Sequence, residues 1–232
     1  MSFRVPAAPD SGGAPAPAQP RGTAGAAERI DLKSRFPELY CPGRQHFVEV
    51  TVPAARYLSV DGHGDPNTSA AYADALELLY TGAYSVRAEL KRRTGAAWVV
   101  GPLEGLWTAP DPGAFARREK DSWDWTMLLP LPAEVAARDL EEGLAAASAK
   151  KPGLVWDALR VIELDEGRCL QILHVGSYDD EAPTLERLHH ELMPGVGLTF
   201  NGPHHEVYLS DPRRTAPEKL RTVLRQPVRP LG

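Results

Sequence analysis

The run CLQILHVGSYDDEAP, residues 169–183, decides the fold because it passes from a strand pattern through a glycine into the start of a helix. Leucines then recur at spacings of three and four residues, which predicts an amphipathic helix: Leu185, Leu188 and Leu192. The MPG of residues 193–195 ends this helix. Two further strand patterns follow, LTFNGPHHEVYLSDP at 198–212 and LRTVLRQPV at 220–228. This half of the chain therefore reads strand, helix, strand, strand.

The first half of the chain has the same order of elements. A β-rich run, HFVEVTVPAARYLSVDG at 46–62, precedes a long helical pattern. The apolar positions of that pattern share one helix face: Tyr72, Leu76, Leu79, Ala83, Val86 and Leu90. Two strand patterns complete this half, AWVVGPLEGLWTA at 97–109 and DSWDWTMLLPLP at 121–132.

Either half alone would leave an apolar sheet face and unpaired strand edges, whereas two paired halves can bury both. We therefore predict an α+β fold in which two βαββ repeats, at about 45–132 and 154–228, form one antiparallel sheet with helices on one face. A connector helix at about 133–153 joins the repeats, and Asp165 to Gly167 mark a hairpin turn. The duplication also predicts a ligand cleft on the pseudo-twofold axis, because clefts between repeats are common ligand sites.

The composition argues against several classes of protein. With 232 residues and a formal net charge of −5, the chain lacks the basic excess that binding to nucleic acid phosphates requires. Cys41 and Cys169 show neither zinc-site nor disulfide spacing, which fits a reducing cytoplasm. The sequence has no membrane-spanning apolar run and no secretion signal. Residues 1–30, rich in Ala, Pro and Gly, are predicted to be a disordered leader because they have little to bury.

Several motifs resemble the GyrI-like small-molecule-binding family over about residues 31–228. These motifs lie at the ends of the predicted strands and helices: DGHGDPN at 61–67, GPLEGLW at 101–107, WDWTMLLPLP at 123–132, HVGSYDDE at 174–181 and HHEVYLSDPRRTAPEKLRTVLRQPV at 204–228. The resemblance implies a duplicated βαββ domain, related to the effector-binding domains of multidrug-responsive regulators. Because residues 1–30 show no helical period that could form a DNA-binding module, it implies a free-standing member.

The free-standing members that this chain resembles open the cyclopropane ring of DNA-alkylating natural products, such as yatakemycin and CC-1065, by adding water. The resemblance therefore implies a hydrolase that needs no cofactor and protects the cell. One alternative is a binding protein that sequesters or senses cationic aromatic drugs without turnover. Another, suggested only by the family's name, is an inhibitory partner of a DNA-handling enzyme such as gyrase. The sequence does not indicate the oligomeric state.

Opening the ring with water needs a base, a hydrogen-bond donor for the oxygen that gains charge, and flat apolar walls. Glu206 is the predicted base, because it belongs to the family motif and the period of two places it on one strand face with His204 and Tyr208. An exposed or salt-bridged glutamate that pairs with Arg213 or Arg214 is the structural alternative. The pseudo-symmetry predicts that Glu104 reaches the same cleft as a second catalytic carboxylate, and Tyr208 is a predicted donor.

Aromatic and polar side chains complete the predicted site. Trp107, Trp123 and Trp125 are predicted to form walls for the ligand, with core packing as the alternative for each. Tyr178 is a predicted donor or anchor, and His174 is a predicted ligand contact that a structural role would also explain. Adjacent histidines do not face one another and the chain has no HExxH motif, so neither a metal nor a cofactor is predicted.

Overall fold

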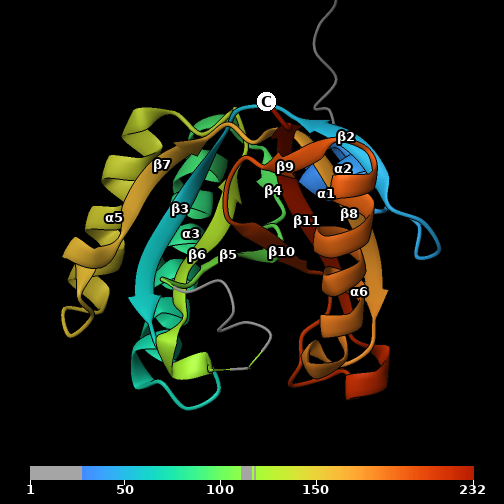
Figure 1. Cartoon of the computed structure of the whole chain (residues 1–232). Helices are drawn as coiled ribbons and strands as arrows, with labels where there is room; N and C mark the ends of the chain where they lie inside the picture. The colour runs from blue at the N-terminus through green and yellow to red at the C-terminus, as the bar shows by residue number, and fades with distance from the viewer. Residues whose placement is uncertain (1–27, 111–116, 118) are drawn as a thin grey trace, which may run out of the picture.

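A computed structural model of the protein describes residues 28–110, 117 and 119–232 (Figure 1). Of the predicted leader, residues 1–27 lie outside this part. The last residues of the leader are already folded, because strand β1 (Arg29–Ile30) pairs in parallel with β4 (Ala97–Trp98). Ile30 is fully buried there, next to Trp98. Burial of one isoleucine explains why Arg29 and Ile30, which the prediction assigned to the leader, are paired in a strand.

One large antiparallel sheet forms the centre of the protein. Its strands are β2 (Val48–Val52), β3 (Ala55–His63), β5 (Leu103–Thr108), β6 (Asp124–Leu131), β7 (Arg160–Leu164), β8 (Gly167–Val175), β9 (Leu198–Phe200), β10 (His204–Tyr208) and β11 (Arg221–Pro230). The strand order is β2-β8-β11-β10-β5-β6-β3-β7, and β9 pairs with β11. Every pair in this sheet is antiparallel, which confirms the predicted α+β fold with a large antiparallel sheet.

Helices surround the sheet (Figure 1). The helical elements that matter below are α1 (Leu32–Arg35), α2 (Pro37–Tyr40), α3 (Ala70–Thr94), η1 (Lys120–Ser122), α5 (Ala137–Lys150), η3 (Tyr178–Asp180), α6 (Ala182–Glu186), the π-helical turn η4 (Arg187–Leu192) and α7 (Met193–Gly195). Helix α3 begins at Ser69, whose hydroxyl accepts from the Tyr72 amide, and ends at Gly95 in the left-handed region. None of the helices within the described ranges is both long and apolar enough to cross a membrane.

The longer helical segments cover one face of the sheet, and the short N-terminal helices cover the other. Leu79 of α3 shares a core with Met127 of β6, and Leu188 of η4 shares a second core with β8 and β11 on that same face. On the opposite face, Leu39 of α2 belongs to a third core with Val207 of β10. The prediction of helices on one face is therefore right for α3 and α6, and incomplete because it omits α1 and α2.

The strand order reads symmetrically outward from the central β10–β5 pair, with β11, β8 and β2 on one side and β6, β3 and β7 on the other. Two βαββ repeats would produce such an order, and the duplication itself stays a prediction. The hairpin predicted at Asp165 to Gly167 is wrong, because β7 pairs with β3 and β8 pairs with β2. The turn residues correctly indicated a bend in the chain, and Gly167 adopts a φ of 61° there. They carry no information about which strands pair.

Candidate functional site

Strands β10 and β5 lie side by side at the middle of the sheet and divide the predicted site residues between its two faces. Their register pairs Glu206 with Gly105 and Val207 with Glu104. Because directly opposite residues share a face and successive residues alternate, Glu206 and Glu104 point to opposite faces. The prediction that both carboxylates reach one cleft is therefore wrong. Glu104 would have to pair directly with Glu206 to share its face, but it pairs with the next residue, Val207. This shift of one residue in the register of β5 against β10 places Glu104 on the other face.

Glu104 belongs instead to a fully buried ionic network on its own face of the sheet. The Tyr40 hydroxyl donates to Glu104 at 3.1 Å. The His205 ring lies between two carboxylates, 3.0 Å from Glu104 and 2.9 Å from Glu166. Arg225 pairs with Glu166 at 3.3 Å. Two carboxylates and two basic side chains balance one another here, so we assign the network a structural role in holding β5, β8, β10 and β11 together.

The charge of His205 predicts how stability depends on pH. Burial opposes this charge, but the charge of Glu166 and hydrogen bonds with Glu166 and Glu104 outweigh burial and raise the pKa of His205 to about 9. An unfolded histidine titrates at about 6.5, so the network's stabilisation is complete below that pH and is lost as the pH rises toward 9. We expect the free energy of unfolding to fall by about 2 kcal/mol between about pH 6 and pH 8. Urea denaturation at several pH values measures this, and a free energy that stays constant or rises would contradict a charged His205.

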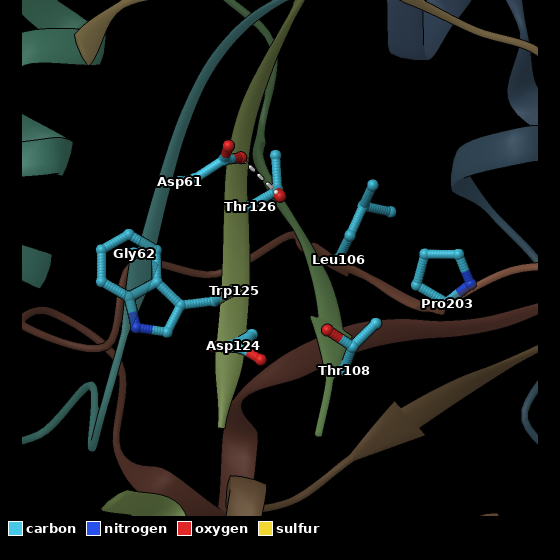
Figure 2. A pocket seen from close by; sticks show the side chains of 8 residues that line it. All are labelled: Asp61, Gly62, Leu106, Thr108, Asp124, Trp125, Thr126 and Pro203. Atoms are coloured by element: carbon cyan, nitrogen blue, oxygen red, sulfur yellow. Dashed lines mark hydrogen bonds between the residues drawn. The ribbon is translucent and has the colours of Figure 1, made fainter. Parts of the chain in front are cut away.

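A surface hollow of about 310 Å³ also lies on the Glu104 face (Figure 2). Asp61, Leu106 and Thr126 are among its lining residues, and the strand register places all three on that face. The Thr126 hydroxyl donates to Asp61 at 2.7 Å across the hollow's wall. This hollow is therefore not the cleft that was predicted around Glu206.

A second carboxyl group, Glu181, joins Glu206 on the other face, where Glu104 was expected. Glu181 directly precedes α6 and is 4% exposed, and the Glu206 side chain is 13% exposed. Burial, and then the negative charge of Glu206, raise the pKa of Glu181 well above its usual range. Glu181 therefore holds its proton more tightly than an ordinary glutamate, as a carboxyl group that acts as a catalytic acid requires.

Tyr208 connects Glu206 to Trp107. The indole Nε1 of Trp107 donates to the Tyr208 hydroxyl at 2.9 Å, and that hydroxyl is hydrogen-bonded to Glu206. Burial, followed by the charge of Glu206, raises the pKa of Tyr208 well above its usual range, so the hydroxyl keeps its proton. Because this proton is engaged by Glu206, the geometry favours Tyr208 as the group that orients the carboxylate rather than as a donor to a ligand.

Tyr178 lies at the exposed edge of this cluster. Its ring meets the Tyr208 ring edge to face, with 5.7 Å between centroids, and Tyr178 is 38% exposed. Burial, and then the charges of Glu181 and Glu206, raise the pKa of Tyr178 to about 12. Tyr178 is therefore a protonated hydroxyl that is close to both carboxyl groups and also reaches solvent.

Trp123 forms the other part of that edge. Its ring packs edge to face on Trp107 at 5.7 Å, and the Lys120 ammonium lies 5.9 Å from its centroid. Lys120 also pairs with Asp179 at 3.4 Å, which links η1 to η3 beside Tyr178. The structure thus brings Trp107, Trp123 and Tyr178 together around Tyr208, and their contact with a ligand stays a prediction.

Two of the predicted ligand contacts are held by the protein's own residues, Trp125 in the core and the half-buried His174 at a turn. Trp125 is 2% exposed, its ring covers Gly62, and it meets Tyr72 edge to face at 5.2 Å. His174 has its Nε2 3.1 Å from the carbonyl oxygen of Ser177. Trp125 is therefore a core residue, and His174 braces the turn that carries the chain into η3.

Among the residues that the structure describes, no group of three or more His, Cys, Asp and Glu side chains is arranged to hold a metal ion. The rings of His189 and His204 lie 6.3 Å apart, edge to face, while His205 points to the opposite side of the sheet. The adjacent histidine pairs therefore do not form a shared ligand set.

Known proteins similar to this chain agree with its fold. Residues 155–229 match the GyrI-like small molecule binding domain. The crystal structure of an uncharacterized conserved protein from Listeria innocua is 35% identical, with a TM-score of 0.78 over 86% of this chain and 100% of that one. The chain belongs to the GyrI-like family. A hydrolase from Listeria innocua is 33% identical, with a TM-score of 0.74 over 86% of this GyrI-like chain and all of its own.

A more distant solved structure shares only the fold. The C-terminal domain of EcmrR is 9% identical, with a TM-score of 0.51 over 80% of this chain and 98% of that domain. No curated protein matches the chain.

Glu181 is the residue of this GyrI-like site that the sequence did not indicate. It is the third of three consecutive acids, after Asp179 and Asp180, at the start of a helix. Acids at that position commonly lie in solvent and interact with the helix dipole, so the pattern gave no reason to separate Glu181 from its neighbours. The motif HVGSYDDE at 174–181, which contains Glu181, resembled the family. However, no strand or helix periodicity indicates that the side chain at position 181 is buried.

Proposed function

We propose that this protein is a cofactor-independent hydrolase that adds water to the cyclopropane ring of DNA-alkylating natural products of the yatakemycin and CC-1065 type. Its place of action would be the cytoplasm, where such compounds reach DNA. The observation that carries the proposal is the buried carboxyl group of Glu181, whose pKa is raised by burial and then by the charge of Glu206. The identity to a Listeria innocua hydrolase supports hydrolysis as the class of reaction, and the motif resemblance supports the substrate.

The two carboxyl groups have complementary roles in this reaction. Glu206 accepts a proton from water while the water oxygen forms a bond to the cyclopropane methylene carbon. The ring carbon–carbon bond breaks, and its electron pair passes through the conjugated dienone to the carbonyl oxygen. Glu181 donates its proton to that oxygen, which gives a phenol and a new alcohol. Water is the only reagent consumed, and Glu206 ends protonated while Glu181 ends ionised.

Aromatic side chains would hold the substrate against this pair. Trp123 is partly buried and would offer its indole to a flat polycyclic ligand, with the buried ring of Trp107 behind it at 5.7 Å. Tyr178, which is partly exposed beside both carboxyl groups, is the candidate donor that accompanies Glu181. Tyr208 holds Glu206 in place through its hydroxyl.

A second function, the binding of cationic aromatic drugs without turnover, is favoured by one specific feature. Glu206 lies close to Tyr72, Tyr178 and Tyr208, whose pKa values are raised first by burial and then in part by its charge. A negative charge surrounded by aromatic rings suits a cation through charge attraction and cation–π contact.

Incubation with a spirocyclopropane dienone alkylator distinguishes the two functions. The hydrolase is expected to give a ring-opened, hydrated product at protein concentrations far below that of the compound, followed by absorbance and by a mass increase of one water. Loss of free compound in a fixed ratio to the protein, with no hydrated product, would instead support the binding protein. A cationic dye such as ethidium, titrated by fluorescence, tests the second function independently.

Gly105 allows the support of Glu206 to be tested. A Cβ at this position would lie 3.0 Å from Nε1 of Trp107 and 3.1 Å from the Tyr208 hydroxyl. Gly105→Ala is therefore expected to separate these two groups and displace Glu206, which should lower turnover about tenfold or more. Overpacking is also expected to lower the free energy of unfolding by about 1 kcal/mol.

Gly153→Ala is the matched control for this change, since a Cβ at position 153 meets no atom within 4 Å. Turnover of the alkylator and thermal melting should both match the unmodified protein in the control. Full turnover in Gly105→Ala would show that the Trp107–Tyr208 hydrogen bond does not support Glu206.

A further inference from the structure

His204 is a buried side chain next to Glu206 whose ring nitrogens make no hydrogen bond within the described part of the chain. Its side chain is 10% exposed, and its Nε2 lies 3.5 Å from Oε1 of Glu206. The register pairs it with Trp107, which places it on the same face as Glu206. Leaving a buried polar group unpaired is unfavourable, which makes His204 a candidate for a functional role.

A second imidazole extends from His204 away from the carboxyl pair. His189 lies in the π-helical turn η4, a local geometry that is frequent at functional sites. Its ring meets the His204 ring edge to face at 6.3 Å, and it is also hydrogen-bonded to the Gln226 side chain. Burial, and then the nearby His204, lower the pKa of His189 to about 4, so its ring is neutral. A neutral imidazole can accept a proton on one nitrogen and release another from the second.

The proposed reaction leaves a proton on Glu206 that must depart before the next turnover. Tyr208 is unable to take it, because its hydroxyl already accepts from Trp107 and is bonded to Glu206 through its own proton. The side chain of His204 is the base next to Oε1 of Glu206. The geometry therefore offers a route for the proton away from the carboxyl pair, toward His204 and then His189.

We propose that His204 is a proton relay that resets Glu206 after each turnover, with His189 as the next group on the way to solvent. The inference rests on the proposed function. The O–H bond of Glu206 breaks, the proton binds one ring nitrogen of His204, and the proton on the other nitrogen leaves toward His189. Solvent returns one proton to Glu181, so no proton is consumed over the cycle. His204 acts through Glu206 and is a positioning residue for proton transfer.

Rapid mixing of the full chain with a spirocyclopropane dienone alkylator tests the relay. In His204→Ala, the first turnover should proceed within about threefold of the unmodified rate, because Glu206 starts without the proton. Later turnovers should slow by about 100-fold, which gives a burst of product followed by a slow phase. Imidazole added to the buffer should fill the space left by the ring and restore the slow phase.

His204→Asn keeps a polar side chain and serves as a second variant in case His204→Ala does not fold. It should show the same burst. His190→Ala is the control, since His190 is the exposed neighbour of His189. A steady rate equal to the unmodified protein, or equal losses in the first and later turnovers with no response to imidazole, would overturn the relay. An unmodified protein that forms no hydrated product would overturn the proposed function itself, and the two failures are thereby distinguished.

Discussion

Glu181→Gln is expected to lower the rate of ring hydration by about 100- to 10,000-fold. Glutamine keeps the shape of the buried side chain but is unable to give a proton to the oxygen that gains charge. Glu206→Gln should cause a loss of similar size, because it removes the base. Ligand binding, measured by tryptophan quenching, should change much less, since Trp107 and Trp123 remain in both variants.

The double variant and a matched control make this expectation sharper. Groups that act as one unit show strongly non-additive effects, so combining Glu181→Gln with Glu206→Gln should cost little more than the worse single change. Glu186→Gln, in the exposed last position of α6, should keep full turnover. Losses that simply multiply in the double variant, or normal turnover in Glu181→Gln, would contradict the pairing of these two carboxyl groups.

Arg225→Met should have the largest effect on stability. Arg225 is 2% exposed, donates to Gln171 at 3.1 Å and to the Leu39 carbonyl at 2.8 Å, and pairs with Glu166. Methionine fills a similar volume but leaves the Glu166 carboxylate with less positive charge in a buried place. Breaking one side of a buried ion pair costs about 3–5 kcal/mol. A protein of this length should then melt about 10 °C lower.

Arg168→Met is the control for the loss of an ion pair. Arg168 pairs with Glu49 at 2.7 Å, but both side chains are about half exposed. Exposed pairs contribute little, so the melting temperature should hardly change. If Arg225→Met melted like this control, the network around Glu166 would not be what holds α2 and the central strands together.

The sequence was sufficient to predict most of the fold, because its signals are local periods. The spacing of Leu79, Ala83 and Val86 predicted α3, and the alternation around Glu206 assigned Tyr208 to the same face. The pairing of β2 with β8 and of β7 with β3 was not predicted. Hydrophobic alternation indicates that a segment is a strand but does not indicate its partner.

The site was only partly predictable for a related reason. Glu206, Trp107 and Trp123 lie within or beside strands whose pattern and motif indicate them. Glu104 was placed on the wrong face because the predicted symmetry did not define the register of β5 against β10. Glu181 was missed because its burial depends on how the chain enters α6 over the sheet, which is a tertiary property.

The protonation state of Glu181 tests the central claim most directly, because it requires no ligand. Carbon-13 NMR of the side-chain carboxyl groups, with the Glu181 signal assigned by its loss in Glu181→Gln, follows this state through a pH titration. We expect Glu181 to keep its proton at pH values at which an ordinary glutamate has lost it, owing to burial and the charge of Glu206. In Glu206→Gln, the Glu181 signal should titrate at lower pH. A Glu181 that ionises like an exposed glutamate, and does not respond to Glu206→Gln, would contradict the account.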